Sequence, residues 1–177
     1  MAAPQNNQVA AAGPIDNADV EDWKIRVNDV LARPSEVLNQ TSPQDAGPWH
    51  AGLFSCFEPI DLCLITWCLP CVTFGKTHHR IRKDANLAGY EPINTSCLLF
   101  CGASCVGIPC VATAMQRADI RDKFHLEGNC LSDLAISCCC GCCTLVQQDK
   151  EVAYRQLNAA PKDQYQPQAG MAYPEQK

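Results

Sequence analysis

The residues of this sequence best suited to chemistry are its 14 cysteines, all of which fall between Cys56 and Cys143. The densest run is Cys138–Cys143, in which five of six residues are cysteine. Such a density indicates a disulfide framework, soft-metal binding by thiolates, or thiols that carry lipid or lie in a membrane. These three explanations differ in the compartment that they require.

The N-terminal segment favours free thiols over disulfides. Residues 1–9 show neither a basic segment nor an apolar one, so nothing there resembles a secretory signal peptide. We therefore expect an intracellular protein that is not secreted. In a reducing compartment structural disulfides are rare, and dense cysteines more often bind metal.

Two cysteine motifs have spacings that suit metal ligation. Cys68 and Cys71 form a C-x-x-C pair, which lets both sulfurs face one ion. Packing has no use for adjacent cysteines that point in several directions, so Cys138–Cys143 indicates a thiolate cluster for soft ions such as Zn(II), Cu(I) or Cd(II).

Other candidate ligands have a competing structural interpretation. Cys97, Cys101 and Cys105 recur every fourth residue and would share one face of a helix, where packing of small apolar thiols competes with metal or lipid contact. For His78 and His79 a solvated role competes with zinc ligation, because both lie within a basic segment.

Composition limits the possible partners. The net charge of −5 gives the chain no nucleic-acid character. Aromatic residues make up only 7% of the chain, so bound metal would supply a constraint that the core lacks. The basic segment indicates either a solvated surface or a contact with anionic lipid headgroups. It consists of Lys76, Arg80, Arg82 and Lys83.

Hydrophobic periodicity predicts a mainly α-helical fold that positions these cysteines. Amphipathic helices are predicted over Asp19–Leu31, Met115–Leu126 and Thr144–Asn158, and no run alternates as a strand would. We predict a small, zinc-stabilised helical domain with disordered tails. The predicted divisions are a tail over 1–17, a helix and linker over 18–48, the cysteine-rich domain over 49–158 and a tail over 159–177.

Three uncharged stretches bear on membrane association. Pro92–Gln116 is 25 residues long and could span a bilayer, but polar residues and Pro109 interrupt it. Leu62–Gly75 is too short for a straight span, and Leu134–Gln148 is only slightly longer and rich in cysteine. The sequence therefore identifies no transmembrane helix.

Two motifs resemble the cysteine-rich PLAC8 family, which includes mammalian onzin, the plant cadmium resistance proteins and the cell-number regulators. The first motif is WHAGLFSCF at 49–57 followed by CLPCVTFG at 68–75, and the second is CCCGCCTLVQQDKE at 138–151. The resemblance extends over residues 49–155, and the segment Phe124–Asn129 looks more like fungal members than animal ones. Several relatives have Cys-Cys-Pro-Cys where this chain has Leu69.

The resemblance implies a non-enzymatic protein of heavy-metal tolerance, or of growth and cell-number control. It also implies membrane association at the cell periphery, which leaves that location open beside a soluble cytoplasmic or nuclear one. We predict zinc as the bound metal, with cadmium as a toxic competitor. The predicted metal ligands are Cys63, Cys68, Cys71, Cys138, Cys139, Cys140, Cys142 and Cys143.

Three functional hypotheses follow. The first is metal tolerance through thiolate binding and stress signalling, with metal ions and a protein partner. The second is a homo-oligomeric membrane metal transporter of the plant cadmium resistance type, with Pro92–Gln116 lining its pore. The third is a zinc-stabilised interaction module that binds its partner through Val152, Tyr154 and Leu157. We predict no enzymatic activity, because the chain has no phosphate-binding loop, G-x-S-x-G or H-E-x-x-H motif.

Overall fold

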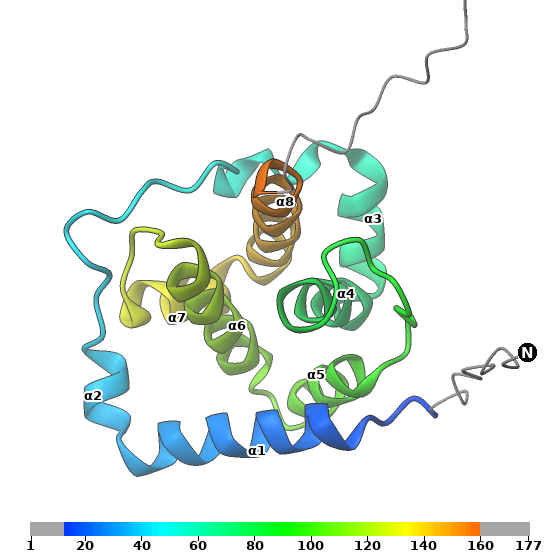
Figure 1. Ribbon diagram of the computed structural model, residues 1–177, viewed down its shortest axis with the longest axis horizontal. Helices are drawn as coiled ribbons and strands as arrows, with labels where there is room; N and C mark the ends of the chain where they lie inside the picture. Colours follow the sequence, from blue (N-terminus) through cyan, green and yellow to red (C-terminus); the bar gives the residue numbers. More distant parts are fainter. Residues whose placement is uncertain (1–12, 160–177) are drawn as a thin grey trace, which may run out of the picture.

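The computed structural model of the chain describes residues 13–159, which are mainly α-helical and contain no strand, as predicted (Figure 1). Of the predicted tails, 1–12 and 160–177 lie outside these residues. The elements are α1 (Asn17–Ala32), α2 (Pro34–Leu38), the 3-10 helix η1 (Leu53–Phe57), α3 (Ile60–Cys68), α4 (Pro70–Arg82), α5 (Thr95–Cys105), α6 (Pro109–Phe124), α7 (Cys130–Cys139) and α8 (Gly141–Ala159).

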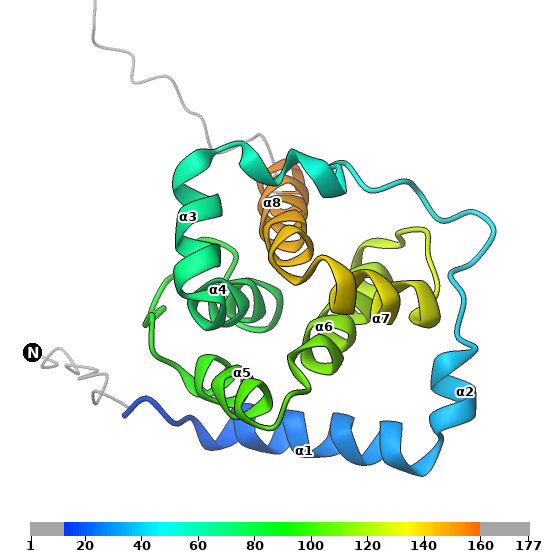
Figure 2. The ribbon, with the colours of Figure 1, turned by 180° about the vertical axis from the view of Figure 1, so that it is seen from behind.

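Helix α8 lies between two groups of helices. It contacts α3 and α4 on one side and α6 and α7 on the other (Figures 1 and 2). Helix α4 also packs against α3 and α5, and α1 runs along the edge formed by α5 and α6. This arrangement brings α4 and α5, each with a cysteine near its N-terminus, side by side.

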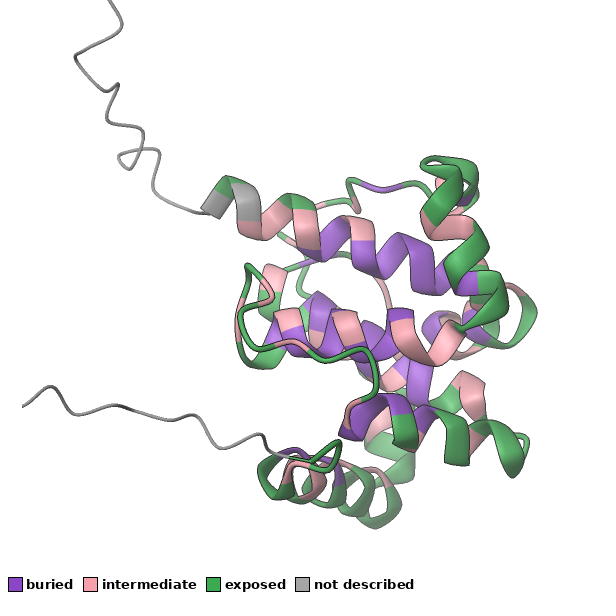
Figure 3. Cartoon of the chain, turned by 90° about the vertical axis from the view of Figure 1, so that its right-hand side faces the viewer, coloured by how far each residue is buried: buried purple, intermediate pink, exposed green. Residues whose placement is uncertain are grey.

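Two apolar clusters hold the helices together, and buried residues face the interior of the bundle in Figure 3. The first cluster joins α1, α4, α5, α6 and α8, and the second lies near the other end of α4 and α8. The first consists of Trp23, Phe74, Phe100, Ala112 and Leu145, and the second of Ile81, Ile120, Leu126 and Val152. Removing this apolar area from water stabilises the packing of otherwise short helices.

A buried ion-pair network joins α6 to α7 and α8. The Nε atoms of Arg117 and Arg121 donate to the two carboxylate oxygens of Asp133, at 2.7 and 2.6 Å. The guanidinium of Arg117 also donates to Gln147 Oε1 at 2.6 Å and lies 3.9 Å from the centre of the Trp49 ring. Burial raises the pKa of the Asp133 carboxyl, and the two arginines oppose that rise.

Helix α8 holds the segment that precedes α3 through polar side chains. The buried carboxylate of Glu151 accepts a hydrogen bond from the Ala51 amide at 2.8 Å, and Gln147 Nε2 donates to the Ala51 carbonyl at 2.7 Å. Lys150 Nζ donates to the carbonyls of Ser55 and Glu58, at 3.0 and 2.7 Å. Polar residues within the second motif thus satisfy backbone groups in the first motif and in the residue that follows its first segment.

Two sequence-based expectations, one for Val152 and one for the stretch Pro92–Gln116, are wrong. Val152 belongs to the second apolar cluster and is fully buried, so it cannot form part of a protein-binding surface as the interaction hypothesis requires. The single helix over Pro92–Gln116 is also absent, because α5 ends at Cys105 and α6 begins at Pro109. Gly107 lies between them with φ of +79°, a conformation that breaks the helix.

The histidines of the basic segment are buried, which contradicts their predicted solvated role. His78 and His79 are 2% and 8% exposed. His78 is covered by α1 and α5, whereas His79 contacts Ala88 and Tyr90 in the segment between α4 and α5. His78 Nδ1 is hydrogen-bonded to Ser96 Oγ at 2.9 Å, and its ring stacks on Trp23 with centroids 5.0 Å apart. Burial, together with the nearby charges of arginines, lowers the pKa of His78 to about 3, so the ring is neutral at pH 7.

The four basic side chains of this segment all contact carboxylates within the protein. Lys76 and Arg80 contact Asp149 of α8 at 3.0 and 3.1 Å. Arg82 and Lys83 instead contact acidic residues near or on α1 and on α6. The segment therefore serves as an internal electrostatic link between α4 and its neighbours, rather than the freely solvated surface that composition suggested.

No single helix among residues 13–159 is both long and apolar enough to cross a bilayer. Helices α3 and α4 meet the length and composition criteria only when taken together, and the chain bends by 113° between them.

Candidate metal site of three thiols

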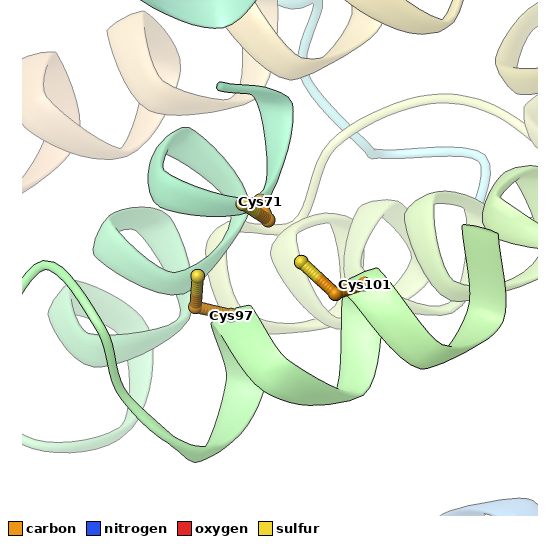
Figure 4. Close-up of side chains that lie close together, drawn as sticks. All are labelled: Cys71, Cys97 and Cys101. Atoms are coloured by element: carbon orange, nitrogen blue, oxygen red, sulfur yellow. The ribbon is translucent and has the colours of Figure 1, made fainter. Parts of the chain in front are cut away.

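The structure brings the thiols of Cys71, Cys97 and Cys101 together between α4 and α5 (Figure 4). Their three Sγ atoms lie within 4.8 Å of one another. Within residues 13–159 no other three histidine, cysteine or acidic side chains place ligand atoms this close together. A zinc–sulfur bond of ~2.3 Å separates tetrahedral sulfur ligands by ~3.8 Å, so small rotamer changes would let one ion contact all three.

Local sequence places two of the thiols in the first turn of a helix and the third one turn later. Cys71 is the second residue of α4, which begins at Pro70, a residue well suited to a first helical turn. Cys97 is the third residue of α5, and its amide donates to the side chain of the N-cap residue Asn94 at 3.0 Å. Cys101 follows one turn later. Because the two cysteines are four residues apart, both present their thiols to α4.

The close approach of the two helices depends on a glycine. A Cβ atom at Gly75 would lie 2.7 Å from Asn94 Oδ1, the oxygen that caps α5. Any larger residue would therefore displace the cap or separate the helices. This gives a physical reason for glycine at the end of the first motif, because the residue sets the position of Cys97 relative to Cys71.

The site is open on one side. Cys97 is buried, Cys71 is half-buried and Cys101 is exposed. Burial raises the pKa of each thiol, so all three are protonated at neutral pH in the absence of metal. The N-termini of α4 and α5 act in the opposite direction and favour thiolates at Cys71 and Cys97. A soft ion would displace the three protons and gain three sulfur ligands.

The side chain of Tyr90 lies beside the three thiols. Its hydroxyl donates to the carbonyl of Val72, the residue after Cys71, at 3.2 Å. Burial, with smaller contributions from Cys97 and other groups, raises the pKa of Tyr90 to about 12. The phenol thus stays neutral and fixes the backbone at the start of α4.

The dense run Cys138–Cys143 does not converge on one point. Helix α7 ends at Cys139 and α8 begins at Gly141, so the chain changes direction within the run. The Sγ atoms of Cys143 and Cys56 lie 2.9 Å apart, whereas the free thiol of Cys138 lies beside that of Cys110. The thiols of this run therefore belong to at least two separate environments.

The structure thus gathers one of the eight predicted ligands, Cys71, into a three-donor group. Cys68, its partner in the C-x-x-C pair, is the last residue of α3 and is exposed on the other side of the break at Leu69. Metal ligation by Cys68, by Cys63 of α3 and by the Cys138–Cys143 run stays a prediction. The predicted ligand set omitted Cys97 and Cys101. Their separation by four residues, which places both on one face of a helix, was the sequence feature that could have identified them.

Comparison with known proteins supports the assignment of the chain to a family. The profile of the PLAC8 family matches residues 49–151, which is more than half of the chain and includes the three thiols. The chain belongs to the PLAC8 family. This range also contains Gln147 and Glu151 of α8, whose hydrogen bonds to Ala51 join the two cysteine motifs of the family region.

Several plant relatives are similar over most of this family region. Plant cadmium resistance protein 2 of Arabidopsis thaliana is 27% identical over 113 residues, covering 64% of this chain and 72% of the relative. Cell number regulator 4 of Zea mays is 27% identical over 68% of this chain and 76% of its own. Plant cadmium resistance protein 9 of Arabidopsis thaliana is 31% identical over 63% of this chain and 73% of its own. No solved structure is significantly similar.

Proposed function

We propose that this PLAC8 protein is a non-enzymatic, thiolate-based metal-binding protein that confers tolerance to cadmium or zinc. The convergence of Cys71, Cys97 and Cys101 is the observation that carries the proposal, because three thiols are a high-affinity donor set for soft ions. Two of the relatives are named as plant cadmium resistance proteins, which supports the same function. The proposal takes the protein to act in a reducing compartment, where the thiols stay free.

The proposed route to tolerance is signalling rather than storage. The described part of the chain holds one group of three thiols, so bulk sequestration would need very large amounts of protein. Because the group joins α4 to α5, binding of an ion would fix the relative position of these helices. We propose that a protein partner detects this change. The relatives named as cell number regulators are consistent with a regulatory role.

The proposal is tested by expressing the chain in cadmium-sensitive cells. The wild type is expected to raise the cadmium concentration that halves growth several-fold, and Cys97→Ser with Cys101→Ser is expected to abolish this gain. Cys105→Ser removes an exposed thiol one turn further along α5 and is expected to leave tolerance intact. Equal protection by the double variant, at equal protein abundance, would show that tolerance does not depend on this site.

A membrane metal transporter is the second candidate, and an apolar surface favours it. Large apolar side chains on η1, α3 and the residue after it are exposed, among them Trp67 at 73%. This surface consists of Phe54, Phe57, Ile60, Leu64, Ile65, Trp67 and Leu69. Soluble proteins rarely expose so many neighbouring apolar side chains. Resistance to carbonate extraction together with metal efflux from intact cells would favour this candidate over the first.

A further inference from the structure

We infer that the site formed by Cys71, Cys97 and Cys101 takes a trivalent thiophilic ion of the arsenite and antimonite class, as a neutral complex with three sulfurs. The inference names the ligand class of the site on which the proposed function rests. It is carried by the number of donors and the charges around them, which distinguish a trivalent ion from zinc, and by a geometry that fits a pyramidal complex.

The number of donors at the site is three. No imidazole or carboxylate oxygen belongs to the group, and the nearest cysteines in sequence, Cys68 and Cys105, lie outside it. A structural zinc ion takes four protein ligands in a tetrahedral arrangement. Arsenic(III) forms three bonds to sulfur, and its lone pair occupies the fourth direction. The thiol group is therefore complete for a trivalent ion and incomplete for structural zinc.

The geometry also suits a pyramidal complex. Cys97 and Cys101 project from successive turns of α5, and Cys71 faces them from α4, so the sulfurs form a triangle (Figure 4). Of the three sulfur atoms, that of Cys101 belongs to an exposed residue and that of Cys97 to a buried one. An ion arriving from solvent would meet the Cys101 thiol first and the buried thiol last.

The charges around the site favour a neutral complex. Three thiolates bound to zinc carry a net charge of −1, and bound to Cu(I) a charge of −2, whereas with arsenic(III) the charge is zero. Lys76 and Arg80 follow Cys71 on α4, and both are already paired with Asp149. Cys71 itself packs against the first apolar cluster. The neutral arsenic(III) complex can be covered by these apolar neighbours, whereas the charged complex of a divalent ion depends on solvent at the exposed Cys101.

The binding step balances without an oxidant or a reductant. Arsenite at neutral pH is As(OH)3, and each of three thiols replaces one hydroxide. Three As–O and three S–H bonds break, three As–S bonds form, and the displaced hydroxides leave with the thiol protons as three water molecules. Arsenic stays in the +3 state throughout, so the complex forms from the reduced protein and arsenite alone.

The test uses the reduced full-length protein with sodium arsenite, and separately with cadmium chloride and zinc chloride. Alkylation of each cysteine is followed by mass spectrometry before and after addition of one equivalent of the ion. We expect arsenite to protect Cys71, Cys97 and Cys101, and to displace zinc supplied at the same concentration. Cys101→Ser is expected to weaken arsenite binding by about a hundredfold, because it removes one arm of a chelate. Cys105→Ser is the matched control and is expected to bind normally.

The outcomes separate this inference from the proposed function. If cadmium protects the three thiols and arsenite does not, or if arsenite fails to displace zinc, the trivalent assignment is overturned while the proposed function stands. If neither arsenite nor cadmium protects them in a folded protein, as judged by circular dichroism, both are overturned. An arsenite affinity that is unchanged in the folded Cys101→Ser variant would show that Cys101 is not a ligand and would also overturn the inference.

Discussion

Replacement of Asp133 by asparagine is expected to lower the free energy of unfolding by about 3–5 kcal/mol. The substitution keeps the shape of the side chain but removes the only carboxylate that the structure shows bonded to Arg117 and Arg121. These arginines are 5% and 3% exposed, so each would hold an uncompensated charge away from water. A loss of this size is a large fraction of the stability of a small domain.

Equilibrium unfolding in urea measures this loss. Asp45→Asn removes an exposed acid that forms no ion pair within residues 13–159 and serves as the matched control, with an expected change below about 0.5 kcal/mol. Adding Arg117→Met to Asp133→Asn is expected to recover part of the stability, because it removes one of the two unpaired charges. An Asp133→Asn protein as stable as the wild type would show that the network contributes little to the fold.

The Cys97→Ser substitution is expected to weaken cadmium binding by roughly a hundredfold. Cys97 is the buried member of the three-thiol group, and a serine hydroxyl is a poor ligand for a soft ion. The fold should persist, because the amide of residue 97 still donates to the Asn94 side chain that caps α5. Competition titration with a chelator of known affinity measures the change.

A matched variant and the pH dependence sharpen this prediction. Cys138→Ser lies in the dense run and is expected to change cadmium affinity at the first equivalent less than twofold. Because burial raises the pKa of all three site thiols, the ion must displace their protons, and affinity should rise as pH increases from about 6 to about 8. A loss in Cys138→Ser equal to that in Cys97→Ser would place the first ion at the dense run instead.

The helical fold was predictable because it depends on local periodicity. The apolar spacing within Asp19–Leu31 and Thr144–Asn158 matches α1 and α8 to within a few residues. The charged residues of these helices were less predictable. Glu151 is fully buried because it binds the amide of Ala51, which lies 100 residues earlier in the chain, and no local pattern indicates such a partner.

The three-thiol group was not predictable for a related reason. Cys97 and Cys101 have the spacing of a helix face, and that spacing fits apolar packing as well as ligation. The packing of α4 against α5, which includes the close approach of Gly75 to Asn94, places this face against Cys71. Conversely, Cys138–Cys143 had the stronger sequence signal, but the break between α7 and α8 separates its thiols.

The most direct test of the proposed three-thiol metal site is the location of the first cadmium ion in the wild-type protein. Each of the 14 cysteines would be alkylated and quantified by mass spectrometry, with and without one equivalent of cadmium. Protection from alkylation is expected to be confined to Cys71, Cys97 and Cys101. Protection centred on Cys138–Cys143, with these three thiols still reactive, would contradict the proposed site.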